Sequence, residues 1–305
     1  MRIILTGPTG VVGTALIRQC IKNRIEVLAI CRRNCARSHR IPKSALVKIL
    51  ELDLEEYARY VPERSEGGYD VFYHFAWEGT AKEARNDVGT QERNIRYALD
   101  AVRLADRFGC HTFIGAGSQA EYGRVEGKLS ARTETFPENG YGMAKLCAGQ
   151  MTGLLCQSLG IRHIWARILS VYGPCDGEDT MLISSIRKLL RGETPQFTKA
   201  EQRWDFLYCD DAARALLLLG EKGKNGKVYC IGSGRTRALA DYIKCMRDAV
   251  SADLDIGIGA LPYASKQVMY LCADISELKE DTGFSPRVPF EEGIKRTVAW
   301  CRENR

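Results

Sequence analysis

The stretch Thr6-Gly7-Pro8-Thr9-Gly10-Val11-Val12-Gly13 follows the short apolar run Arg2–Leu5 and opens a segment of helical periodicity. Glycines at this spacing let the backbone turn sharply, approach a pyrophosphate closely and pack a helix against a strand. The start of the helix also offers amide donors to a phosphate. The stretch therefore predicts a dinucleotide-binding turn, with a plain strand-to-helix turn as the alternative. The predicted contacts are Gly7, Thr9, Gly10, Val11, Val12 and Gly13.

Apolar runs of strand length alternate with helical segments after this turn, as in successive βαβ units. Residues 1–170 are therefore predicted to form an α/β, doubly wound parallel sheet of the Rossmann type. Residues 171–305 contain more turns and predict a smaller C-terminal substrate-binding lobe, with part of the chain returning to the sheet. The predicted strands are Arg2–Leu5, Glu26–Ile30, Leu46–Ile49, Val71–Phe75, Thr112–Ile114 and His163–Ile168, and the predicted helices are Thr14–Lys22, Gln91–Phe108, Tyr141–Leu159, Met181–Arg191 and Leu239–Val250.

The composition narrows the function classes. The 305 residues are 45% hydrophobic and 27% charged, with a net charge of +6, which is typical of a globular protein. The basic residues are scattered, which argues against nucleic-acid binding. Twelve cysteines without a Cys-x-x-Cys pair and four dispersed histidines predict no metal site. No apolar run approaches the roughly 20 residues that span a bilayer, and no signal segment precedes the first strand, so a cytoplasmic protein without membrane contact is expected.

The end of the second predicted strand indicates which dinucleotide binds. Cys31-Arg32-Arg33 contains no carboxylate to hold the ribose hydroxyls of NAD, whereas two guanidinium groups can pair with a 2′-phosphate. The sequence therefore favours NADP over NAD, with Arg32 and Arg33 as solvated loop residues in the alternative. Asp53, after the third strand, is either an acceptor for the adenine amino group or the N-cap of the next helix.

A second group of residues suggests hydride chemistry. Tyr141 and Lys145 are four residues apart at the start of a predicted helix, so their side chains share a face. A nearby ammonium favours the phenolate and brings a tyrosine towards acid–base strength. Upstream, residues 115–123 (GAGSQAEYG) place the Ser118 hydroxyl at the carboxyl edge of the sheet, where it can bond to a carbonyl oxygen.

Taken together, these motifs resemble the extended branch of the short-chain dehydrogenase/reductase superfamily, the NAD-dependent epimerase/dehydratase family, over nearly the whole chain. The resemblance implies that Tyr141 is the acid–base residue, that Lys145 holds the nicotinamide ribose and that Ser118 orients the reacting oxygen. It rests on the glycine turn, Tyr141 with Lys145, Ser118 four residues before Tyr122, His74–Trp77 (HFAW), Asn94, Arg167–Pro174 (RILSVYGP) and Arg203–Asp211 (RWDFLYCDD). The further cofactor contacts that it implies are Asp53, Leu54, Phe75, Ala76, Trp77 and Asn94.

Extended members of that superfamily mostly act on nucleotide-activated sugars, so the resemblance implies such a substrate. Glu121 is either one of its contacts or a structural hydrogen-bond acceptor. The resemblance also implies a homodimer, formed through the helix pair Gln91–Phe108 and Tyr141–Leu159. The implied substrate contacts are Trp77, Ser118, Gln119, Glu121, Tyr141, Ser170, Tyr172 and Arg203.

Departures from the family pattern select among its reactions. Gln119 and Ala120 stand where dehydratases of the family carry an Asp-Glu pair, so elimination of water lacks its proton carriers. The chain looks most like the 4-ketoreductases, which use NAD(P)H to reduce the C4 keto group of a nucleotide-activated 4-keto-6-deoxyhexose. The alternatives are an NAD-dependent nucleotide-sugar 4-epimerase and a non-enzymatic NADP-sensing protein. Ser170 replaces an asparagine and Trp204 an arginine, which leaves the sugar and its base open.

Overall fold

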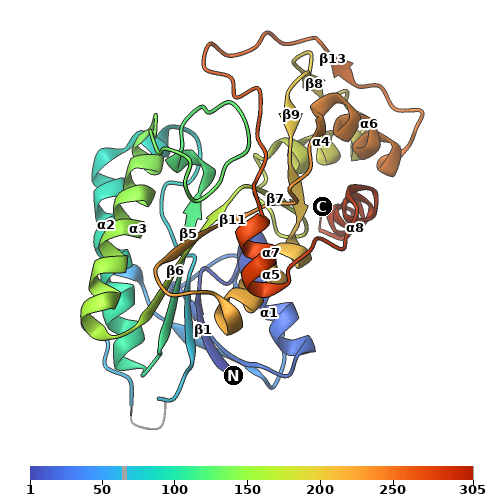
Figure 1. Ribbon diagram of the computed structural model, residues 1–305. Coiled ribbons are helices and arrows are strands. Elements are labelled where there is room, and N and C mark those ends of the chain that lie inside the picture. The colour runs from blue at the N-terminus through green and yellow to red at the C-terminus, as the bar shows by residue number, and fades with distance from the viewer. Residues whose placement is uncertain (64–66, 305) are drawn as a thin grey trace.

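The centre of the molecule is a seven-stranded parallel sheet, shown in Figure 1. The computed structural model describes residues 1–63 and 67–304. The strand order β11-β6-β5-β4-β1-β2-β3 is that of a doubly wound Rossmann sheet, which confirms the predicted fold class. The strands are β1 (Arg2–Thr6), β2 (Glu26–Cys31), β3 (Val47–Glu51), β4 (Val71–His74), β5 (Thr112–Ser118), β6 (Arg162–Ile168) and β11 (Lys227–Ile231).

Helices cover both faces of the sheet. Helices α2 (Val88–Arg107) and α3 (Gly140–Leu159) pack together on one face, and α1 (Val11–Lys22) and α5 (Cys209–Lys222) on the other. Ile3–Leu5 of the central strand β1 are fully buried, as expected for a parallel strand covered on both sides. This packing brings the carboxyl ends of the strands to one edge, where the predicted site residues lie.

The remaining elements form a lobe beside that edge. Three short strand pairs, β7 with β10, β8 with β13 and β9 with β12, pack with three helices, and their apolar residues join the core on the α1 and α5 face of the sheet. The elements are β7 (Ser170–Tyr172), α4 (Met181–Leu190), β8 (Gln196–Phe197), β9 (Arg203–Trp204), β10 (Phe206–Tyr208), β12 (Arg237–Ala238), α6 (Leu239–Val250), β13 (Gly257–Ile258) and α8 (Phe290–Glu303), with α7 (Ser276–Thr282) against α5 and β11.

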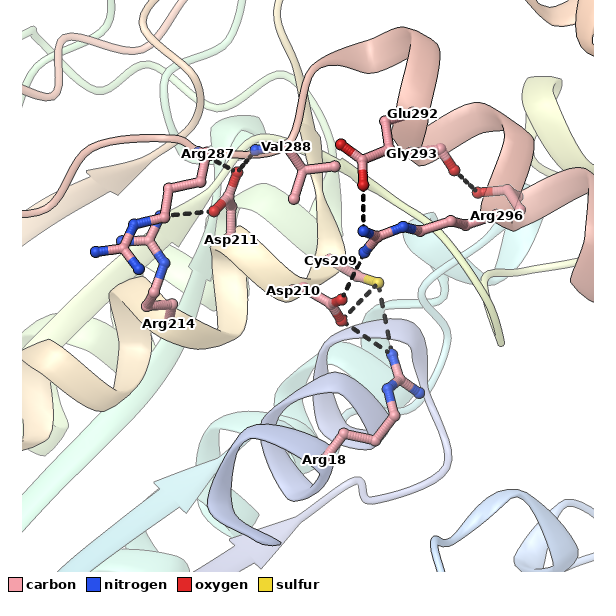
Figure 2. Close-up of polar contacts among 11 residues, drawn as sticks. Arg18, Cys209, Asp210, Asp211, Arg214, Arg287, Val288, Glu292, Gly293 and Arg296 are labelled. Carbon is pink, nitrogen blue, oxygen red and sulfur yellow. Dashed lines mark hydrogen bonds and ion pairs between the residues drawn. The ribbon is translucent and has the colours of Figure 1, made fainter. Parts of the chain in front are cut away.

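The first turn of α5 connects the lobe to the sheet, as Figure 2 shows. The carboxylate of Asp210 lies 3.4 Å from the guanidinium of Arg18 on α1 and 3.5 Å from that of Arg296 on α8. The buried carboxylate of Asp211 accepts two backbone hydrogen bonds from residues 287–288 at 2.7 and 2.8 Å. The acidic pair of the RWDFLYCDD motif therefore holds α1, α5, α8 and residues 287–288 together.

No helix of residues 1–63 and 67–304 is long and apolar enough to cross a membrane. Within the same residues, no group of three or more His, Cys, Asp or Glu side chains is placed to hold a metal ion.

Candidate active site

The glycine turn forms a tight cradle between β1 and α1. Gly7 has φ +71°, and a Cβ atom there would lie 2.9 Å from the backbone nitrogen of Ala76. A Cβ atom on Gly13 would lie 2.3 Å from the carbonyl oxygen of Gly7, so only glycine fits both positions. Gly10 caps α1 without a side-chain hydrogen bond, which leaves the first amides of the helix to an anionic ligand.

Two cavities meet at this cradle and share Gly7, Gly10, Phe75 and Trp77. The adenosine cavity, of about 240 Å³, extends over the ends of β1 and β2. The reacting cavity, of about 440 Å³, extends over the start of α1 to β5 and α3. Together they form a continuous groove that suits a dinucleotide, with its pyrophosphate at the cradle. The predicted residues that line it are Gly7, Thr9, Gly10, Val11, Val12, Gly13, Arg32, Asp53, Leu54, Phe75, Ala76, Trp77, Ser118, Tyr141 and Lys145.

The two arginines after β2 behave differently. Arg32 lines the adenosine cavity, together with Arg37, which the sequence analysis did not identify. Arg33 instead pairs with Glu56, and its guanidinium lies 3.7 Å from Asp53, so two carboxylates balance the charge that was expected to meet a 2′-phosphate. Asp53 is the N-cap of the short helix η2 (Leu54–Glu56), as one of the two interpretations predicted, and also lines the cavity.

Ser118 and Tyr141 come together on the wall of the reacting cavity. Ser118 ends β5, and Tyr141 lies in the first turn of α3. Burial raises the pKa of Tyr141, while a hydrogen bond with Ser118 and the charge of Arg85 lower it. Arg85 belongs to η4 (Lys82–Asn86), and its guanidinium lies 4.4 Å from the centre of the Tyr141 ring. No local motif marks Arg85, so the sequence analysis missed it.

Lys145 is buried in the same wall of the reacting cavity. Its ammonium donates to the carbonyl oxygen of Ala116 at 2.7 Å and lies 3.6 Å from the centre of the Trp77 ring, against 5.8 Å from that of Tyr141. Burial lowers the pKa of Lys145 to about 7, opposed by the charge of Glu121. Arg85 lies closer than Lys145 to the centre of the Tyr141 ring, and its charge is among the causes that lower the pKa of Tyr141.

Several predicted contacts lie outside the groove. The buried amide of Asn94 bonds to the backbone nitrogen and oxygen of Glu78 at 3.0 and 2.9 Å and so holds the loop after β4. Glu121 is fully buried and accepts hydrogen bonds from the Ser118 backbone, the Trp165 indole and Arg167. Its structural interpretation is thus the one that the contacts support.

Some of the predicted substrate residues line a cavity and others do not. Gln119 begins η5 (Gln119–Glu121) and Arg203 is exposed, and neither lines any of the cavities described for residues 1–63 and 67–304. Arg203 donates instead to the carbonyl oxygen of Thr236 at 3.1 Å. Tyr172 lines a third cavity, although its hydroxyl donates to the carbonyl oxygen of Phe290.

This third cavity, the lobe cavity, has a volume of about 560 Å³ and adjoins the reacting cavity. Its lining is mostly apolar and includes Ser170 and Trp204, the two departures from the family pattern. The indole of Trp204 donates to the Ser170 hydroxyl at 2.8 Å, so the two replacements form one contact in the wall.

Known proteins share this architecture. The dTDP-glucose 4,6-dehydratase of Streptomyces niveus is 24% identical over 321 residues, which cover 100% of this chain and 94% of the relative. A UDP-N-acetylglucosamine 4-epimerase structure from Methanobrevibacter ruminantium superposes with a TM-score of 0.88 at 21% identity and covers 100% of this chain and 99% of its own. A UDP-glucuronic acid 4-epimerase from Bacillus cereus in complex with NAD gives 0.85 at 22% identity, with 100% and 99% covered.

The family model agrees with the relatives and with the resemblance noted in the sequence. The model for the NAD dependent epimerase/dehydratase family matches residues 3–232, which include the cradle, Ser118, Tyr141 and Lys145. The chain belongs to the NAD dependent epimerase/dehydratase family.

Proposed function

We propose that the chain is an NADPH-dependent reductase of the C4 keto group of a nucleotide-activated 4-keto-6-deoxyhexose. The observation that carries this proposal is the pair of adjoining hydroxyls, Ser118 and Tyr141, on a wall continuous with the glycine cradle. The nucleotide-sugar class is supported by the family and by the relatives, whose names specify dTDP- and UDP-linked sugars.

The side chains around the reacting cavity supply the proton chemistry. A bound nicotinamide supplies hydride to C4 of the sugar. Because burial raises its pKa, Tyr141 is protonated at neutral pH and can donate its proton to the oxygen on C4, which completes the alcohol. Ser118 donates a hydrogen bond to the same oxygen and fixes its position. Arg85 then stabilises the phenolate that remains.

The cofactor end favours a reductase over an epimerase. A reductase exchanges its spent cofactor at every turnover, and NADPH is the usual hydride donor in reduction. Arg32 and Arg37 line the adenosine cavity, so two guanidinium groups are available to a 2′-phosphate. The second candidate is a nucleotide-sugar 4-epimerase with retained NAD. It is supported by the similar structures, two of which are nucleotide-sugar 4-epimerases, and by the carboxylates that balance the charge of Arg33.

One assay separates the candidates. The protein is incubated with NADPH or NADH and a panel of nucleotide 4-keto-6-deoxysugars, and the absorbance of the reduced nicotinamide is followed. We expect stoichiometric loss of NADPH with at least one sugar. Interconversion of stable hexoses without net change of the cofactor would establish the epimerase instead.

The variant Tyr141→Phe tests the role of the phenol. We expect it to abolish turnover, because the ring keeps its packing but loses the proton donor, while the affinity for NADPH stays nearly unchanged. Turnover and NADPH binding by fluorescence are measured on the same preparation. Retained activity would overturn the assignment of Tyr141.

A further inference from the structure

The two cavities on the substrate side meet at a junction formed by Leu169, Val171 and Asp176, which line both. If the chain reduces a nucleotide sugar as proposed, the reacting carbon lies beside Ser118 and Tyr141 in the reacting cavity. Because Leu169, Val171 and Asp176 line the reacting cavity as well, a hexose ring bound there can contact all three side chains.

Few charged side chains line the two cavities that meet at this junction. Among the described residues that line the two cavities, Lys145 is the only lysine or arginine and Asp176 the only carboxylic acid. The ammonium of Lys145 already bonds to the carbonyl oxygen of Ala116 and packs on Trp77. Arg85 contacts the Tyr141 ring but does not belong to either lining.

The carboxylate of Asp176 is held in place at the start of α4. Its two oxygens accept from the backbone nitrogen of Gly177 at 2.7 Å and from the hydroxyl of Thr180 at 3.2 Å. Desolvation raises its pKa to about 6, so the group is mostly ionised at neutral pH. An ionised carboxylate only accepts hydrogen bonds, and a second carboxylate close to it in a desolvated cavity is strongly disfavoured.

The apolar side of the junction complements this charge. Leu169 is buried and Val171 half-buried, and both belong to the segment around β7 that separates the two cavities. They offer a methyl-sized apolar contact and no hydrogen-bond donor from their side chains. A hexose whose C6 is a methyl group matches them, whereas a C6 carboxylate would face apolar atoms and the like charge of Asp176.

We propose that Asp176 determines the sugar specificity of this protein, accepting a hydroxyl of a neutral 6-deoxyhexose packed on Leu169 and Val171 and rejecting hexoses that carry a C6 carboxylate. The proposal rests on the proposed function and narrows its substrate class. The fold itself does not impose the exclusion, because one similar structure is a UDP-glucuronic acid 4-epimerase in complex with UDP-glucuronic acid. The exclusion comes from the residues that line this chain's junction.

The test measures binding of matched sugar pairs by calorimetry to the full-length protein saturated with cofactor. UDP-glucose is compared with UDP-glucuronate, and GDP-mannose with GDP-mannuronate, since each pair differs only at C6. We expect the acidic member of a pair to bind at least about tenfold more weakly to the wild type, the equivalent of about 1.4 kcal/mol. In Asp176→Asn, which keeps the shape and removes the charge, this ratio should fall at least about threefold through tighter binding of the acidic member.

The matched control is Asp179→Asn, on the same loop. Asp179 is exposed and pairs with Lys82, so its replacement changes the net charge equally without altering the junction. Its binding ratio should equal that of the wild type. Equal affinities for both members of a pair, or an unchanged ratio in Asp176→Asn, would overturn the role of Asp176 while leaving the proposed function standing. Failure of UDP-, GDP- and dTDP-linked hexoses alike to bind the NADPH-loaded protein would overturn both.

Discussion

At the scale of single residues, Lys145 shows how burial changes the pKa of a side chain in the candidate site. Its ammonium is buried, and the contacts that replace water are one carbonyl oxygen, of Ala116, and the face of Trp77. One hydrogen bond and one ring do not fully replace hydration, so burial lowers the pKa of Lys145 from 10.5 to about 7. Burial, together with the charge of the same ammonium, lowers the pKa of His74 to about 3, so His74 stays neutral.

This shift predicts a pH dependence of stability. Below pH about 7 Lys145 is charged in both states, and the folded protein carries the full unfavourable free energy of burial. Between about 7 and 10.5 the unfolded chain binds more protons, so the contribution of Lys145 to stability becomes more favourable as the pH rises. Lys145→Met should therefore gain most over the wild type below pH 7. Urea unfolding of both proteins across this range measures the difference, and a difference that does not vary with pH would contradict the prediction.

At the scale of elements, the first turn of α5 connects the sheet to the lobe through ion pairs and hydrogen bonds. The carboxylate of Asp211 is 2% exposed and accepts two backbone N–H groups from residues 287–288. Asp210, one residue earlier, contacts the guanidinium groups of two partly exposed arginines at 3.4 and 3.5 Å. The buried carboxylate has backbone partners that cannot turn to solvent, whereas the arginines can.

Replacing the two aspartates should therefore have unequal effects. We expect Asp211→Ala to lower the free energy of unfolding by about 2–4 kcal/mol, because two N–H groups lose their acceptor and Arg214 loses its carboxylate. Asp210→Ala, the matched control, should lose about 1 kcal/mol or less. Chemical denaturation of both variants gives the comparison. Losses of equal size would show that Asp211 contributes no more than Asp210 to the stability of the fold.

The elements also show what local patterns can predict. The cradle, Ser118 and Tyr141 were predicted because each depends on a short spacing within one turn or strand end. The end of β5 was predicted too early, at Ile114, because glycines are uncommon in strands. Gly115 and Gly117 pair with β6 as part of the strand. Both positions require glycine, because an added Cβ atom would lie 2.1 and 2.4 Å from the Trp165 side chain of β6.

Residues that tertiary packing brings to the site could not be predicted from a short sequence spacing. Arg85 in η4 and Asp176 in the turn before α4 belong to no motif, and only the folded chain places them beside Tyr141 and the cavity junction. Arg33 was expected to face a phosphate, but its partner Glu56 comes from the turn after the adjacent strand β3. The strand β11 was not predicted from the sequence, because it is short and follows a turn-rich segment.

At the scale of the whole molecule, α2 and α3 leave apolar side chains on their outer face. Met143, Met151 and Leu154 of α3 are 54%, 42% and 70% exposed, and Cys147 lies between them at helical spacing. Val88, at the start of α2, is 77% exposed. Apolar side chains gathered on one helix face are typical of a surface that another protein covers.

We therefore predict that the chain forms a homodimer through α2 and α3, as the resemblance implied. Light scattering after size exclusion should give twice the 34.1 kDa mass of the chain. The double variant Met151→Glu with Leu154→Glu should be monomeric, because two carboxylates on each chain would be buried against apolar atoms. Ile49→Glu, at an exposed side chain of the edge strand β3, should remain dimeric. A monomeric wild type, or a double variant that still dimerises, would place the interface elsewhere.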